Sequence, residues 1–169
     1  MRRLPFRVGG LTAAVALALV AAGCGMAVPG KSGADSVKVV SSSVGMHLVD
    51  AQGRSLYLFA RDEKGDSYCY GACAAVWPPV EADKTPAATG LPASALGTFK
   101  RNDGEMQVTY RGHPLYYYSA DASTPGKMRG EDVKQFGAGW YLVGQNGKSV
   151  EPKGDSGGSN NSNNSGGGY

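Results

Sequence analysis

The chain has 169 residues, 18% of them charged, and a formal net charge of +3. Arg2, Arg3 and Arg7 are the only charged residues before Cys24, and the remaining 14 basic residues balance the 14 acidic ones. With this balance, nothing in the composition indicates a basic surface of the kind that binds nucleic acid or anionic membranes.

The first elements along the chain are those of an export signal. The three arginines precede a run of small and apolar residues, Val8–Ala22, which is too short for a comfortable membrane span. The run ends in Val20-Ala21-Ala22-Gly23-Cys24, which resembles the lipobox of bacterial lipoproteins. That resemblance implies cleavage after residue 23 and a diacylglyceryl group on Cys24. The protein would then be held on the outer face of the cell membrane, or on the outer membrane of a diderm. The alternative is an ordinary signal peptide with an incidental cysteine.

Composition divides the rest of the chain into three parts. Residues 24–36 are small and polar and are expected to form a lipid-anchored flexible tether. Residues 37–152 are long enough for one small domain with its own core. Residues 153–169 are almost entirely Gly, Ser and Asn, and we expect this tail to be disordered because it cannot bury apolar surface.

The domain contains an internal repeat with a spacing of 59 residues. The segment 49–62 recurs as 108–121, and the two copies extend over about 44–80 and 104–147. Each copy is predicted to be a β-hairpin that turns at Gly53 or Gly112, because aromatic and β-branched residues lie between turn residues. Strands are predicted, in chain order, at Val37–Ser41, Met46–Val49, Leu56–Ala60, Thr98–Arg101, Met106–Tyr110, Leu115–Ser119 and Trp140–Val143. Pro78 and Pro79 limit any helix to one turn around Cys73–Val76. We therefore expect an all-β, antiparallel domain of two related hairpin units, sandwich- or barrel-like.

Cys69 and Cys73 are the two cysteines of the domain. In an oxidising compartment this even pair predicts a disulfide, which would fix the turn Tyr70-Gly71-Ala72. Two sulfurs alone make a poor metal site, because structural zinc requires four ligands.

The repeated pattern Tyr-x-aromatic-x-x-Asp resembles the motif of a "secreted repeat" lipoprotein family. It occurs as Tyr57-x-Phe59-x-x-Asp62 and as Tyr116-x-Tyr118-x-x-Asp121, and the two copies are followed by Trp77 and Trp140. The segment Cys69–Pro79 is also similar to that family. The resemblance implies a secreted, repeat-built lipoprotein, and it implies no biochemical activity, because none is established for the family.

Two interpretations of the motif remain open. In the structural one the aromatic side chains are core, and Asp62 and Asp121 accept backbone N–H bonds in turns just past the strands. In the functional one the rings and carboxylates line a groove for an envelope ligand such as a sugar, a peptide or a protein. Nine tyrosines in so short a chain favour a binding surface, because tyrosine offers a large contact area at low entropic cost.

No catalytic constellation, resident cofactor or metal site is predicted, and the sequence leaves the oligomeric state open. The preferred hypothesis is a non-enzymatic binding or scaffold module of the cell envelope. A second is a redox or electron-transfer accessory, which would use the Cys69/Cys73 dithiol or a metal bound by His47, His113 and nearby methionines. A third is a cell-wall hydrolase with Asp62 and Asp121 as paired carboxylates.

Overall fold

A computed structural model describes residues 34–150. The predicted signal peptide, Cys24, the tether up to residue 33 and the tail at 153–169 lie outside these residues. The end of the predicted tether already belongs to the domain, since Ala34 is 3% exposed and the first strand begins at Ser36.

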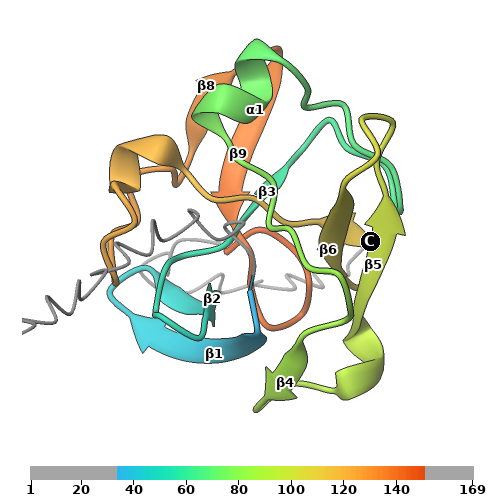
Figure 1. Ribbon diagram of the computed structural model, residues 1–169. Coiled ribbons are helices and arrows are strands. Elements are labelled where there is room, and N and C mark those ends of the chain that lie inside the picture. The colour runs from blue at the N-terminus through green and yellow to red at the C-terminus, as the bar shows by residue number, and fades with distance from the viewer. Residues whose placement is uncertain (1–33, 151–169) are drawn as a thin grey trace, which may run out of the picture.

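The described chain consists of short strands and very little helix (Figure 1). The strands are β1 (Ser36–Ser42), β2 (Gly45–Asp50), β3 (Tyr57–Phe59), β4 (Ala87–Thr89), β5 (Leu96–Lys100), β6 (Met106–Tyr110), β7 (His113–Pro114), β8 (Val133–Gln135) and β9 (Ala138–Leu142). The helical segments are α1 (Ala72–Val76) and two 3-10 turns, η1 (Ala93–Ala95) and η2 (Ser119–Asp121). Within residues 34–150, no helix is long and apolar enough to span a membrane.

The strands form three sheets of three strands each, with the orders β2-β1-β4, β3-β9-β8 and β5-β6-β7. The predicted all-β, repeat-built, antiparallel fold is confirmed, with one exception: β4 runs parallel to β1. The sheets of the described residues do not close into a barrel, which was one of the two arrangements expected.

Both predicted hairpin turns are present, but the strand after each turn differs from the prediction. After the first turn, β3 pairs with β9 rather than continuing along β2. After the second turn, only β7 pairs with β6, and the predicted strand Leu115–Ser119 is replaced by isolated bridges at Tyr116 and the turn η2. The chain leaves each hairpin early because its next residues pair with the other copy of the repeat.

Backbone hydrogen bonds show that the two copies exchange their C-terminal segments. Val80 of the first copy bonds to the second: its N–H donates to Leu115 O at 2.9 Å, and its carbonyl accepts from Val108 N at 2.8 Å. Val143 of the second copy does the same in the first, with Leu56 O at 3.1 Å and Leu48 N at 2.8 Å. The two copies are therefore related by an approximate two-fold arrangement, and neither copy is complete without the other.

The same bonds refine the repeat spacing. Leu56 N donates to Leu48 O and Leu115 N donates to Val108 O, so Leu48 is the structural counterpart of Val108. The spacing of 59 residues applies from the turn onward, and the first turn is one residue longer than the second.

Two hydrophobic clusters make up the core. The first contains mainly aliphatic side chains from β1, β2, β5 and β6, such as Val37, Leu48, Leu96 and Val108. The second contains the motif aromatics and the cysteines, and its buried members are Tyr57, Phe59, Cys69, Cys73, Trp77, Tyr116, Trp140, Leu142 and Val150. The repeated motif thus lies where the two copies meet.

Candidate functional site

The two copies of the motif meet at their first tyrosines. Tyr57 N donates to Tyr116 O and Tyr116 N donates to Tyr57 O, both at 2.9 Å, which makes an antiparallel bridge between equivalent residues. Both side chains are fully buried. Each tyrosine hydroxyl then reaches the aspartate of the other copy: Tyr57 donates to Asp121 Oδ2 at 2.7 Å, and Tyr116 donates to Asp62 Oδ2 at 2.6 Å. We call Tyr57–Asp121 and Tyr116–Asp62 the exchanged Tyr–Asp pairs.

The second oxygen of each aspartate accepts a backbone hydrogen bond in a turn. Asp62 Oδ1 accepts from Tyr68 N at 2.8 Å, and Asp121 Oδ1 accepts from Arg129 N at 3.0 Å. Both carboxylates are thereby occupied on both oxygens. This arrangement suits structural acceptors and leaves neither oxygen pair directed at a substrate, so it gives no support to the paired-carboxylate hydrolase.

The second aromatic residue of each motif and the two tryptophans form one continuous stack of four rings. Phe59 stacks on Trp140 with ring centroids 4.2 Å apart, and Trp140 stacks on Trp77 at 4.0 Å. Trp77 stacks on Tyr118 at 4.1 Å. The order again alternates between copies, since Trp140 covers the first motif and Trp77 covers the second. Tyr57 and Tyr116 pack edge-on against Trp77 and Trp140, an arrangement that aromatic quadrupoles favour.

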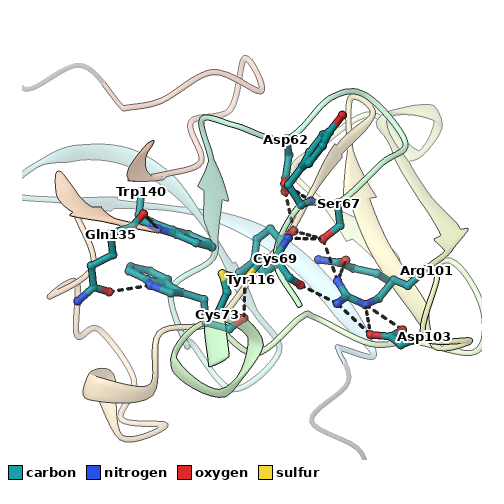
Figure 2. The surroundings of a disulfide bond; sticks show 12 residues. Asp62, Ser67, Cys69, Cys73, Arg101, Asp103, Tyr116, Gln135 and Trp140 are labelled. Atoms are coloured by element: carbon teal, nitrogen blue, oxygen red, sulfur yellow. Dashed lines mark hydrogen bonds and ion pairs between the residues drawn. A yellow bond between two sulfur atoms is a disulfide. The ribbon is translucent and has the colours of Figure 1, made fainter. Parts of the chain in front are cut away.

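Gln135, at the end of β8, satisfies both buried indoles. Its side-chain Oε1 accepts from Trp77 Nε1 at 2.9 Å, and its backbone carbonyl accepts from Trp140 Nε1 at 3.2 Å. Figure 2 shows Gln135 beside the ring of Trp140. Because a buried N–H without a partner is costly, these bonds fix the hairpin of β8 and β9 to the ring stack.

The predicted Cys69–Cys73 disulfide is present, with Cα atoms 5.2 Å apart. Cys69 is 0% exposed and Cys73 is 6% exposed. A dithiol exchange protein requires an accessible sulfur, so the burial of both argues against that form of the redox hypothesis.

A buried arginine connects the disulfide loop to the second copy (Figure 2). Arg101, 2% exposed, donates to Cys69 O at 2.8 Å, to Ser67 Oγ at 3.1 Å and to Gln107 Oε1 at 2.6 Å. Asp103 is its ionic partner, 3.0 Å away. Ser67 Oγ accepts from Arg101 and from Cys69 N, and it lies 2.7 Å from the Tyr116 hydroxyl. The hydroxyl proton of Ser67 is therefore directed at Tyr116, whose own proton is directed at Asp62.

Burial shifts the ionisation of the exchanged pairs. Desolvation raises the pKa of Tyr57 and Tyr116 well above the ordinary value for tyrosine, and the nearby carboxylates raise them further. The pKa of Asp62 rises to about 6, because burial outweighs the hydrogen bonds from Tyr116 and Tyr68 that favour the charged form. Asp62 consequently changes charge near neutral pH.

The structure places the predicted motif residues in the core. Tyr57, Phe59, Trp77, Tyr116 and Trp140 are at most 2% exposed, and Asp121 is 7% exposed. They do not form the aromatic groove of the functional interpretation. Asp62 and Tyr118 differ, because both are half-buried, and Tyr118 lies at one end of the ring stack.

The residues suggested for a metal differ in their surroundings. His47 is 2% exposed, whereas its neighbour Met46 is 50% exposed, as expected for alternate faces of a strand. His113 lies at the second hairpin turn, in β7. Within residues 34–150, no group of three or more His, Cys, Asp or Glu residues is placed to hold a metal ion.

Three residues that the sequence analysis did not single out are essential to this arrangement: Arg101, Gln135 and Gly130. Gly130 packs so closely against Tyr57 and Trp77 that a Cβ atom would lie 2.7 Å and 2.9 Å from their rings. Arg101 contacts Cys69, Gln135 contacts Trp77 and Gly130 contacts Tyr57, and each of these partners is distant in the chain, so the local sequence does not reveal the role of the three residues.

A comparison with known families also divides the chain into its two repeat copies. A lipoprotein family described as a secreted repeat of unknown function matches residues 38–81 and 97–144, together just over half of the chain. Each matched segment begins with β1 or β5, one strand earlier than the predicted repeats. No curated protein and no solved structure matches the chain.

We predict that Asp62 makes the stability of the domain depend on pH between about 4 and 6. Because its pKa is higher in the folded state than its ordinary value of 3.8, the folded protein binds more protons in this window than the unfolded chain. The resulting stabilisation is fully present below pH 3.8 and is lost as the pH rises through 6. The free energy of unfolding of the parent and of Asp62→Asn should be measured with urea. As the pH rises over this range, the parent should lose stability relative to Asp62→Asn. Above pH 7 the difference between the two proteins should be constant. A difference independent of pH would contradict the assignment.

The disulfide should behave as a structural crosslink. Cys69→Ala/Cys73→Ala should lower the free energy of unfolding by about 2 kcal/mol, the chain-entropy value for so short a loop. In the parent, reduction by dithiothreitol, followed by alkylation and mass spectrometry, should be slow in water and should accelerate with urea in step with unfolding. Rapid reduction of the native protein would instead favour a redox role.

Proposed function

Because the chain belongs to this family of secreted repeats, we propose that it is a lipid-anchored, non-enzymatic binding module of the outer cell envelope. Cys24, after the apolar run Val8–Ala22, would carry the lipid. The motif side chains support the non-enzymatic part, since the exchanged Tyr–Asp pairs and the ring stack direct them at one another. We therefore expect the binding surface to consist of exposed side chains that this core holds in place.

The observation that carries the proposal is an exposed phenylalanine at the tip of the β8–β9 hairpin. Phe136 and Gly137 form its two-residue turn, with φ angles of +55° and +88°. Turns of this kind favour Asn-Gly, because a bulky side chain is strained at positive φ. Phe136 is also 40% exposed. The chain thus keeps a residue that disfavours the turn and leaves apolar area in water, a combination typical of a functional position.

Further side chains extend this tip into a surface patch. Arg61 Nη1 lies 3.9 Å from the position of a Cβ at Gly137, and the guanidinium carbon lies 5.4 Å from the ring centroid of Tyr68. Tyr68 is 45% exposed. We call Phe136, Arg61 and Tyr68 the tip patch. Aromatic residues and arginine are the types enriched at protein–protein interfaces, so the partner we propose is a protein.

The placement of the tip patch suits such a partner. The described chain begins at β1, and β1 and β8 lie at opposite ends of the ribbon (Figure 1). A lipid at Cys24 would hold the β1 end towards the membrane, leaving the hairpin tip to face outward. The two bonds to Gln135 keep the hairpin rigid, which reduces the entropy lost on binding.

We predict that a photoreactive phenylalanine analogue at position 136 of the full, membrane-bound chain forms one recurrent protein adduct. Mass spectrometry would identify it in cells. Excess soluble domain should suppress the adduct, and the same domain with Phe136→Asn should not. Phe136→Asn should leave the free energy of unfolding unchanged or raise it by about 1 kcal/mol, because asparagine tolerates positive φ. The loss of binding would therefore not reflect misfolding.

The same analogue at Met46 is the matched control, since Met46 is 50% exposed on β2, outside the tip patch. No adduct at position 136, or the same adducts from both positions, would refute the tip patch as a binding surface. Mass spectrometry of the mature chain that finds no lipid on Cys24 would refute the lipid anchor separately.

A further inference from the structure

The two ends of the four-ring stack are not equivalent. Phe59, at the first end, is 2% exposed, and its counterpart Tyr118, at the other end, is half-buried. Tyr118 lines a pocket with a volume of about 70 Å³, between the first hairpin turn and the turn η2. The ring stack is thus closed at the Phe59 end and open at the Tyr118 end. This departure from the approximate two-fold arrangement indicates that the second copy has a separate role there.

The pocket wall carries polar groups that the rest of the fold holds in fixed positions. Asp50, 0% exposed, accepts from Arg54 Nε at 2.6 Å. Arg54 Nη2 donates to the hydroxyl of Tyr117 at 2.8 Å, and that hydroxyl donates to Asp50 Oδ2 at 3.0 Å. The guanidinium also lies over the Tyr117 ring, 4.0 Å from its centroid. These bonds use Nε and Nη2 of the guanidinium and do not use Nη1, and Arg54 lines the pocket.

The opposite wall supplies hydroxyl groups. Ser119, Ser123 and Thr124 line the pocket and are exposed. The bonds from Gly65 N to Gly112 O and from Gly126 N to Gly53 O make Gly65 the structural counterpart of Gly126, so this turn is two residues longer in the second copy than in the first. Ser119 corresponds to Ala60, which has no hydroxyl, and Ser123 and Thr124 lie in the longer turn. The open end of the stack therefore combines an aromatic ring, a fixed guanidinium and several hydroxyls.

We propose that this pocket is a sugar-binding subsite that takes the hydroxyl-bearing edge of a single hexose unit. Short polar donors and acceptors match sugar hydroxyls, and the Tyr118 and Tyr117 rings offer apolar area to the C–H groups. The volume has room for about five water-sized groups, enough for one edge of a hexose but not for a whole ring. The site is independent of the tip patch, so the proposal goes beyond the function proposed above.

The test uses methyl glycosides of glucose, galactose and N-acetylglucosamine with the soluble domain. Saturation-transfer NMR should show transfer to the ring protons of at least one glycoside at millimolar concentration. The intrinsic fluorescence should change with the same affinity, because Trp77 stacks on Tyr118. Ser123→Ala/Thr124→Val should weaken this binding about tenfold, the loss expected for one or two hydrogen bonds.

Lys64→Ala is the matched control, because Lys64 lies in the corresponding, shorter turn of the first copy, and it should bind as the parent does. Unchanged thermal unfolding of the variants would show that the fold is intact. Absence of transfer to all three glycosides would overturn the proposal, since the subsite recognises an edge that hexoses share. Equal transfer in the parent and in Ser123→Ala/Thr124→Val would also overturn it. Neither result bears on the adduct at Phe136.

Discussion

The first tyrosine of each motif, Tyr57 or Tyr116, gives its hydroxyl proton to the motif aspartate of the other copy of the repeat, and the remaining structure is arranged around that exchange. The backbone bridge between Tyr57 and Tyr116 brings the copies together. The bonds to Asp121 and Asp62 fix their relative position, because a buried phenol without an acceptor would destabilise the fold. The ring stack and the exchanged segments at Val80 and Val143 follow the same two-fold arrangement. A single copy on its own would leave its groups in all of these contacts without their partners.

The two halves have diverged around this shared centre. Beside Asp62 the chain closes the surface with the disulfide loop, and Arg101 fastens that loop to the second copy. Beside Asp121 the cysteines are missing, and the turn after η2 leaves the pocket beside Tyr118. The hairpin of β8 and β9 rises from the ring stack through Gln135 and carries Phe136 outward. The internal symmetry thus supplies rigidity, and the departures from it provide the two candidate binding surfaces.

Much of the fold was predictable from the sequence, and the limits have identifiable causes. Alternating aromatic and β-branched residues located β2, β6 and β9 because these strands are long enough to show their pattern. Strands β4 and β8 were missed because each has three residues and no apolar run. The motif revealed which residues mattered but not their partners, since Tyr57 and Asp62 look like a local pair five residues apart. Gln135 and Phe136 gave no local signal because their roles depend on rings and backbone angles set elsewhere.

The exchange between copies is tested most directly by double-mutant cycles on the two tyrosines and two aspartates, with Tyr→Phe and Asp→Asn changes and urea unfolding at pH 7. The exchanged pairs, Tyr57 with Asp121 and Tyr116 with Asp62, should show coupling energies of about 0.5–3 kcal/mol. The pairs within one copy, Tyr57 with Asp62 and Tyr116 with Asp121, should be additive to within about 0.5 kcal/mol. Coupling within a copy and additivity between copies would contradict the exchange and the fold built on it.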